Sequence, residues 1–281
     1  MSLESGKFTI LHLSDVHATT GELLYGQVDG LARLEQVAEY AVSAGITPEA
    51  VVVTGDLIQR GNPEAYPALA EALTRVGDRV KAPVFTILGN HDDPASAHCL
   101  DGHNAHHYRV LEVGPVRFVL LDSSTGRLDD EQLAWLSATL ANDHSAPGSM
   151  GTVVAVHHAP VPSPLPTLSK LGLGNADAFG TALAGSDVRT VLAGHYHHPM
   201  SATFQGVPVF VGPSLAYHQV MNAGPDHVSG HDLAMFSLVH LTPTSVGAAP
   251  VSLLATDPLF SSPAPHTRHL SPLVRTSQPT P

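Results

Sequence analysis

Five short stretches of the sequence place metal-binding types of side chain directly after an apolar run. In chain order they are Asp15-Val16-His17, Gly55-Asp56, Gly89-Asn90-His91-Asp92, His157-His158 and Gly194-His195-Tyr196-His197. Imidazole, carboxylate and amide oxygen together suit Fe, Mn, Co or Zn better than Ca²⁺. The stretches therefore indicate a transition-metal centre built from distant parts of the chain, at the strand ends where sites of α/β proteins form.

Seven side chains in these stretches are candidate ligands. They are Asp15, His17, Asp56, Asn90, His157, His195 and His197. If the carboxylate of Asp56 bridges two ions, the seven side chains supply four bonds to each ion. Ions that accept five or six ligands then keep positions for water and substrate oxygens, as hydrolysis by a metal pair about 3.5–4 Å apart requires.

Residue spacing predicts how neighbouring candidates are aimed. Asp15 and His17 are two positions apart, so an extended backbone would direct both side chains to the same side. The same reasoning applies to the two histidines of the last stretch. His158 directly follows His157, so in an extended segment its side chain would point to the opposite side. This predicts a supporting or packing role for His158 rather than ligation.

The elements that must position these side chains follow an α/β pattern, with alternating strands and helices first and mostly strands later. Strands are predicted at residues 8–14, 51–54, 84–88, 108–113, 116–122, 152–156, 190–193, 201–204, 207–211 and 233–241. Helices are predicted at 31–41, from Pro63 to about 76, at 129–140 and at 176–183. Because candidate ligands come from both halves, we expect a second sheet packed on the first.

Composition indicates one folded domain followed by a tail. The chain has 281 residues, of which 43% are hydrophobic and 14% charged, so it can bury a substantial core. We assign residues 1–260 to one domain. Residues 261–281 accumulate Ser, Thr and Pro without apolar periodicity, and we expect an extended tail there.

Charge and cysteine content exclude several classes of protein. The 25 acidic and 13 basic residues give a net charge of -12, which leaves no wide cationic surface for general nucleic-acid binding. The single cysteine, Cys99, cannot form an internal disulfide, which fits a reducing compartment. The sequence has no run of about 18 apolar residues and no secretory pattern at its start. We therefore expect a cytoplasmic protein.

The five stretches, taken together and in this order, resemble the signatures of the calcineurin-like metallophosphoesterases. The resemblance covers roughly residues 8–198. The Gly89-Asn90-His91-Asp92 form, the His157-His158-Ala159-Pro160 sequence and the compact size most resemble the bacterial class III cyclic nucleotide phosphodiesterases. One departure is Ala159, where relatives commonly have proline, and it affects only a loop.

The resemblance implies a four-layer αββα sandwich, with two mixed sheets flanked by helices, and makes residues 1–260 the catalytic domain. One ion would take Asp15, His17, Asp56 and His197, and the other would take Asp56, Asn90, His157 and His195. Fe or Mn is the expected metal, with Zn or Co as alternatives. His91 and the ligand Asn90 are the expected catalytic residues. His91 would face the phosphate and either protonate the departing oxygen as a general acid or stabilise charge on it. Asp92 would orient His91.

The implied activity is hydrolysis of a small phosphodiester, most simply 3′,5′-cyclic AMP or a related cyclic nucleotide, by a hydroxide that bridges the metals. The alternatives within the same fold are a glycerophosphodiesterase, a broad-specificity phosphomonoesterase or phosphodiesterase, and a nuclease, against which the acidic charge argues. A different class is a non-catalytic interaction module, which should lack several ligands. Family precedent suggests a homodimer, although no heptad pattern supports one. Tyr217 and His218 are candidate substrate-pocket residues.

Overall fold

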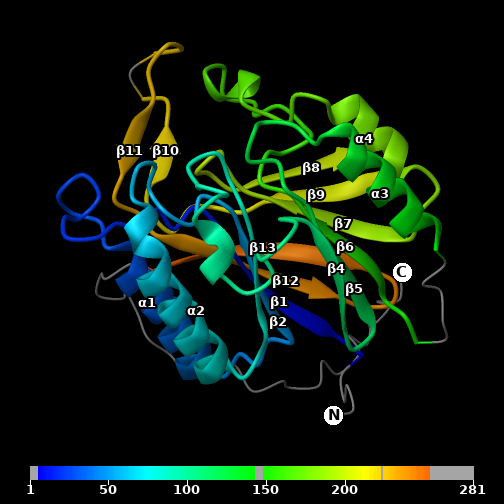
Figure 1. Cartoon of the computed structure of the whole chain (residues 1–281), viewed down its shortest axis with the longest axis horizontal. Coiled ribbons are helices and arrows are strands. Elements are labelled where there is room, and N and C mark those ends of the chain that lie inside the picture. The colour runs from blue at the N-terminus through cyan, green and yellow to red at the C-terminus, as the bar shows by residue number, and fades with distance from the viewer. Residues whose placement is uncertain (1–5, 143–147, 223, 254–281) are drawn as a thin grey trace, which may run out of the picture.

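The computed structural model describes residues 6–142, 148–222 and 224–253. The predicted tail at 261–281 lies outside the described residues. Two large mixed sheets stand face to face at the centre of the molecule, with helices on their outer faces (Figure 1). Among the described residues, no helix is both long enough and apolar enough to cross a membrane.

The first sheet has the strand order β13-β12-β1-β2-β3. Strands β1, β2 and β3 run parallel to one another, whereas β12 pairs antiparallel with both β1 and β13. The strands span Phe8–Leu13 (β1), Ala50–Thr54 (β2), Val84–Ile87 (β3), Met235–Leu241 (β12) and Val246–Ser252 (β13). The parallel arrangement places the carboxyl ends of β1, β2 and β3 at one edge.

The second sheet has the order β4-β5-β6-β7-β9-β8, and its central strands β5, β6, β7 and β9 are parallel. Its strands span Arg109–Val113 (β4), Val116–Leu120 (β5), Gly151–Ala155 (β6), Val188–Ala193 (β7), Met200–Phe204 (β8) and Val207–Val211 (β9). A separate hairpin, formed by β10 (His218–Val220) and β11 (Ser229–His231), projects from the body at the upper left of Figure 1.

Helices cover the outer face of each sheet. The first pair, α1 (Gly30–Ser43) and α2 (Tyr66–Val80), packs on the first sheet, and the second pair, α3 (Asp130–Ala141) and α4 (Ala176–Leu183), packs on the second (Figure 1). Short 3-10 turns lie at Pro63–Ala65 (η1), Ala97–Cys99 (η2) and Leu168–Lys170 (η3). Asp29 and Asp129 cap α1 and α3 by accepting hydrogen bonds from first-turn N–H groups.

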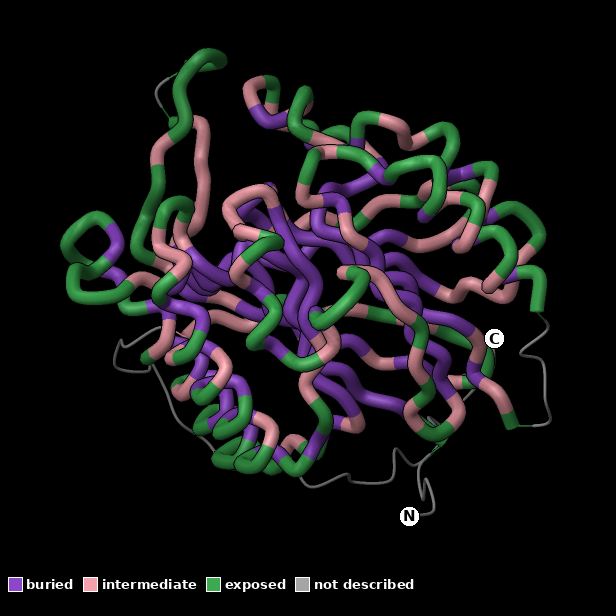
Figure 2. The backbone as a smooth tube through the Cα atoms, viewed as in Figure 1, coloured by how far each residue is buried: buried purple, intermediate pink, exposed green. Residues whose placement is uncertain are grey.

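Alternation of side chains along β1 explains the layering. Every residue of β1 is buried: Phe8 and Ile10 belong to the core between the sheets, while Leu11 and Leu13 belong to the core beneath α1 and α2. Phe118 of the second sheet faces Phe8 across the interface, with ring centroids 6.0 Å apart. A strand that is apolar on both faces must be covered by another layer of the protein on each side. Figure 2 shows both sheets as the most buried part of the molecule.

The structure confirms the α/β class, the two packed sheets and the predicted α4 at residues 176–183. The helix predicted from Pro63 begins as the 3-10 turn η1 and continues as α2 to Val80, beyond the predicted end near residue 76. Strands β10, β11 and β13 were not predicted. Their short or mixed polar sequences and their partly exposed positions give little apolar periodicity.

Candidate metal centre

The predicted ligands lie at the edge of the two sheets where β1, β2, β3, β6 and β7 end. Five of these residues have a left-handed backbone: Asp15 (φ 54°), His17 (φ 47°), Asp56 (φ 48°), His195 (φ 75°) and His197 (φ 52°). A residue with a Cβ pays roughly 1–2 kcal/mol for this conformation, and such strain concentrates at functional sites. The expectation of an extended backbone is therefore wrong here, because sharp loops rather than strand geometry aim these side chains.

The first of two clusters consists of Asp15, His17, Asp56 and His197. All four side chains are buried, and their ligand atoms lie within 4.8 Å of one another. Nε2 of His197 lies 3.3 Å from Oδ1 of Asp15 and 3.1 Å from Nε2 of His17. This is the set of side chains that the family resemblance implied for one ion.

Hydrogen bonds on the far side of the two imidazoles show why an ion fits the first cluster. Nδ1 of His17 donates to Oε1 of Gln59 at 2.8 Å, and Nδ1 of His197 donates to the backbone oxygen of Tyr217 at 3.1 Å. In the neutral rings both Nε2 atoms therefore present lone pairs to each other. Oδ1 of Asp15 is buried and has no hydrogen-bond partner among the described residues. Electron pairs that converge without a donor between them are what a cation would stabilise.

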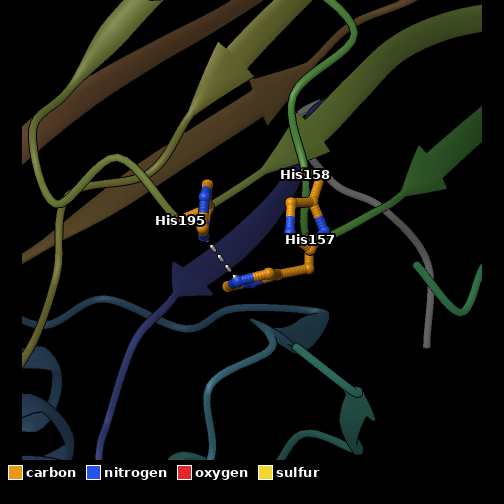
Figure 3. Close-up of side chains that lie close together, drawn as sticks. All are labelled: His157, His158 and His195. Atoms are coloured by element: carbon orange, nitrogen blue, oxygen red, sulfur yellow. Dashed lines mark hydrogen bonds between the residues drawn. The ribbon is translucent and has the colours of Figure 1, made fainter. Parts of the chain in front are cut away.

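The second cluster consists of Asn90, His157, His195 and one oxygen of Asp56. Nε2 of His157 lies 3.2 Å from Oδ1 of Asn90 and 3.4 Å from Oδ1 of Asp56. Nδ1 of His195 lies 3.2 Å from the same Nε2 atom (Figure 3). Nδ1 of His157 bonds the backbone oxygen of Thr54 at 2.7 Å, which fixes the ring so that Nε2 faces the cluster.

Asp56 is common to both clusters. Its Oδ2 lies 3.7 Å from Nε2 of His17, and its Oδ1 lies 3.4 Å from Nε2 of His157. Oδ1 also accepts a hydrogen bond from the backbone N–H of His91 at 2.8 Å. One carboxylate thus offers a separate oxygen to each cluster, as a ligand that bridges two ions must.

His158 lies closer to the second cluster than its sequence parity predicted. The atoms that His157, His158 and His195 could offer to an ion lie within 4.8 Å of one another, and Figure 3 shows the three side chains grouped together. The ring centroid of His158 is 4.4 Å from that of His195. Nδ1 of His158 pairs with Oγ of Ser123 at 3.0 Å, which holds the ring beside the second cluster. The supporting role of His158 stays a prediction.

Protonation in the two clusters suits metal binding. Burial lowers the pKa of His17 to about 4 and that of His195 to about 3, so both rings are neutral at pH 7. Burial alone would raise the pKa of Asp15 and Asp56, but nearby imidazoles hold both below the usual range. Burial would also lower the pKa of His157, but the carboxylate of Asp56 raises it to about 9. Binding of an ion would displace that proton.

Two glycines in the motifs are required by close approach. A Cβ on Gly194 would lie 1.9 Å from Oγ of Ser14 and 3.1 Å from Oδ2 of Asp15. A Cβ on Gly89 would lie 2.3 Å from Oδ1 of Asp56. These distances leave room only for hydrogen, so the glycines allow the loops to bring ligands of separate strands into contact.

His91 lies beside the first cluster, and Gln59 holds its ring. Nδ1 of His91 pairs with Oε1 of Gln59 at 3.2 Å, the same oxygen that accepts from His17. The expectation that Asp92 orients His91 is wrong, because the carboxylate of Asp92 accepts hydrogen bonds from the backbone N–H groups of Gly89 and Leu57. Asp92 shapes the loop, whereas Gln59 positions the ring.

Sequence reasoning missed Gln59 because glutamine is a rare metal ligand and carries no motif signal by itself. Its position three residues after Asp56 was the only available indication. Tyr217, which the sequence suggested as a pocket residue, lies against the centre: its ring centroid is 4.2 Å from that of His197. His218 begins the neighbouring strand β10.

Sequence relatives share the catalytic region. The calcineurin-like phosphoesterase family model matches residues 8–199. A probable cyclic nucleotide phosphodiesterase of Rhodococcus erythropolis is 36% identical over 84% of this chain and 80% of its own length. A cAMP/cGMP dual specificity phosphodiesterase of Mycobacterium tuberculosis is 36% identical over 85% of this chain and 77% of its own length.

A solved structure shows the same fold at low sequence identity. The dimetal phosphatase of Danio rerio superimposes with a TM-score of 0.58 and 16% identity, over 86% of this chain and 98% of that protein. The match to the family model spans all five stretches that build the two clusters. The chain therefore belongs to the calcineurin-like phosphoesterase family.

Proposed function

We propose that the protein is a metal-dependent phosphodiesterase that hydrolyses cyclic nucleotides at a dinuclear centre. The observation that carries the proposal is the pair of clusters that share Asp56, whose two carboxylate oxygens face an imidazole of each cluster. The two sequence relatives described above are named for cyclic nucleotide hydrolysis, which favours cyclic AMP and related compounds as substrates. A non-catalytic module would have no need to keep every ligand and His91.

The residues present fit two transition-metal ions. Asp15, His17, Asp56 and His197 would hold one ion, and Asp56, Asn90, His157 and His195 would hold the other. The mixture of imidazole and carboxylate favours Fe or Mn, with Zn or Co as alternatives. When bound, the ions would polarise the phosphate and lower the pKa of a coordinated water.

His91 is the proposed general acid. Burial lowers the pKa of its imidazole and Arg60 lowers it further, against an opposing effect of Asp56. An anionic phosphodiester beside the ring would raise that pKa and favour the imidazolium that a general acid requires. Nδ1 then donates to Gln59, and Nε2 is left to protonate the departing oxygen.

The proposal extends to location and assembly. A cytoplasmic location fits a lone cysteine, Cys99, that is exposed and free. Cell fractionation with an antibody would test the location. Sedimentation velocity would test the homodimer that family precedent suggests.

Activity assays test the function directly. Protein loaded with Mn²⁺ or Fe²⁺ is incubated with cyclic AMP, cyclic GMP, bis(p-nitrophenyl) phosphate, a glycerophosphodiester and p-nitrophenyl phosphate. We expect metal-dependent hydrolysis of the diesters, with cyclic nucleotides preferred. Preference for the glycerophosphodiester or the monoester would support the alternative activities, and no turnover of any phosphoester would contradict the proposal.

A further inference from the structure

A hollow of about 500 Å³ opens beside the metal centre, between the loop that follows β1 and the hairpin β10–β11. Its lining includes Tyr25, Val28, Tyr217, Gln219 and Asp232. Cavities of this size are typical of sites for small ligands. None of the metal-centre residues lines the hollow, so it is a separate compartment with its own chemistry.

Tyr217 connects the hollow to the metal centre. Its ring centroid lies 4.2 Å from that of His197 and 6.0 Å from that of His17. The backbone on either side is tied to the same histidine: the oxygen of Tyr217 accepts from Nδ1 of His197, and the N–H of Gln219 donates to the oxygen of His197 at 2.9 Å. A molecule whose phosphate lies at the metals can therefore place its next group in the hollow.

Aromatic and apolar side chains form one part of the hollow. Leu24, Val28 and Ala216 form a small buried cluster against which Tyr217 packs. The ring of Tyr25 stands at 71° to that of Tyr217, with centroids 5.6 Å apart. The two tyrosine rings, together with Val28 and Val228 in the lining, suit an aromatic ligand, because stacking on an aromatic side chain stabilises any planar base.

Tyr25 is unusual in two respects. Its side chain is 70% exposed, which makes it an exceptional exposed aromatic residue in this molecule. Its backbone is left-handed, with φ 52°, a conformation that is rare for a bulky residue. Strain of this kind persists where it positions a side chain for a ligand.

Two acceptor groups in the hollow are available to a ligand. Oε1 of Gln219 is buried and has no hydrogen-bond partner among the described residues. The carboxylate of Asp232 lies in the same lining. Among the described residues, no lysine or arginine lines the hollow, and the amino groups of a nucleobase could donate to Oε1 of Gln219 and to the carboxylate of Asp232.

The walls are held in place before any ligand binds. Arg33 of α1 donates to the backbone oxygens of Leu215 and Ala216 and also pairs with Asp232. One guanidinium thus fixes the segments on both sides of the hairpin. A preformed wall reduces the ordering that a ligand must impose.

We propose that this hollow is the subsite for the nucleobase of the substrate, which packs against the rings of Tyr25 and Tyr217 with its amino groups directed to Gln219 and Asp232. The inference rests on the proposed function, because it places the phosphate of the same molecule at the two clusters. It assigns base recognition to residues 25–28 of the loop after β1 and to residues 217–232 around β10–β11, which provide no predicted metal ligand.

Two substrates that differ only in the base separate this proposal from the proposed function. One is cyclic AMP, and the other is methyl β-D-ribofuranoside 3′,5′-cyclic phosphate, which has the same cyclic phosphate and no base. The expected kcat/KM for cyclic AMP is about tenfold higher or more, because base stacking is worth about 1–3 kcal/mol. Hydrolysis of both compounds with equal kcat/KM would overturn the subsite and leave the phosphodiesterase activity intact.

Variants of two tyrosines locate the effect. Tyr25→Ala should lower the ratio of kcat/KM between the two substrates about tenfold, and folding is not at risk because the side chain is exposed. Tyr40→Ala removes a tyrosine that is 38% exposed on α1, outside the hollow, and should leave the ratio unchanged. An unchanged ratio in Tyr25→Ala, or an equal fall in Tyr40→Ala, would overturn the proposal.

A binding measurement without catalysis completes the test. Saturation-transfer NMR with adenosine, and ribose as the control ligand, is carried out on protein kept in EDTA. We expect saturation of the adenine protons, lost in Tyr25→Ala and retained in Tyr40→Ala. Absence of an adenine signal in the unaltered protein would contradict the subsite even if cyclic AMP is hydrolysed.

Discussion

Gln59 is not a proposed metal ligand, but it holds two side chains of the proposed centre. Its Oε1 accepts from Nδ1 of both His17 and His91, at 2.8 and 3.2 Å. This fixes Nε2 of one ring toward the first cluster and leaves Nε2 of the other free for substrate. A proposed ligand and a proposed acid therefore depend on one amide oxygen.

We expect Gln59→Leu to lower the affinity for metal about 10–100-fold, as loss of a hydrogen bond behind a ligating imidazole usually does. The value of kcat should fall as well, because His91 loses its orientation. Titration of the protein with Mn²⁺, followed by calorimetry, measures the affinity. Gln59→Glu keeps an acceptor oxygen and should retain metal binding. Equal affinity in Gln59→Leu and the unaltered protein would contradict this role.

His91 separates catalysis from metal binding. Because its side chain belongs to neither cluster, His91→Ala should retain both ions while lowering kcat about 10²–10⁴-fold, the range for a general acid. Steady-state kinetics and metal analysis of the same preparation measure the two effects. Loss of both metals in this variant would show that His91 is a ligand.

At the scale of elements, the site depends on sharp loops that follow β1, β2 and β7. Gly194, after β7, approaches Oγ of Ser14 so closely that a Cβ would lie 1.9 Å away. Gly194→Ala should therefore displace the loop of Asp15, abolish metal binding at the first cluster and lower the melting temperature. The added Cβ in Gly247→Ala, in β13, meets no atom of the described residues within 4 Å, so this variant is the matched control. Normal metal content in Gly194→Ala would contradict the packing argument.

Apolar patterns predicted the elements better than they predicted the geometry of the loops. The runs around Phe8–Leu13 and Ala50–Thr54 are visible in the sequence because every residue there is buried. Strand β13 has Pro250 within it and alternates small residues at a sheet edge, so its pattern is weak. The left-handed backbone of Asp15 and His197 leaves no trace in periodicity, and only the residue types of the motifs indicated that these side chains meet.

The partnership of Gln59 with His91 also lay beyond the sequence. Several residues near His91 can accept a hydrogen bond, and the adjacent Asp92 was the simplest choice. The carboxylate of Asp92 instead accepts hydrogen bonds from the backbone N–H groups of Leu57 and Gly89. Tertiary packing decides which nearby acceptor pairs with His91, and the pattern of residue types along the sequence does not contain that information.

For the whole molecule, buried histidines predict a loss of stability in acid. Burial lowers the pKa of His12 to about 4 and that of His103 to about 3, both below the unfolded value of 6.5. The unfolded state therefore binds more protons below pH 6.5, so stability is full above that pH and falls as the pH drops toward 4. Each residue should cost about 1 kcal/mol between pH 7.5 and 5.5.

Urea unfolding in EDTA at these two pH values tests the prediction. His103 is a suitable probe because it is 1% exposed and hydrogen-bonded to Thr86, away from the predicted ligands. His103→Gln should reduce the difference in free energy of unfolding between the two pH values by about 1 kcal/mol. An identical pH dependence in the variant would show that His103 does not contribute.

Both sheets supply ligands, so the proposed ions would join the two halves of the molecule through Asp56. The most direct test of this claim is the metal content of the unaltered protein and of Asp56→Ala, measured by inductively coupled plasma mass spectrometry after loading with Mn²⁺. We predict about two ions per chain in the unaltered protein and loss of both on removing the shared carboxylate. An unaltered protein without bound metal, or an Asp56→Ala variant that keeps both ions, would contradict the dinuclear centre.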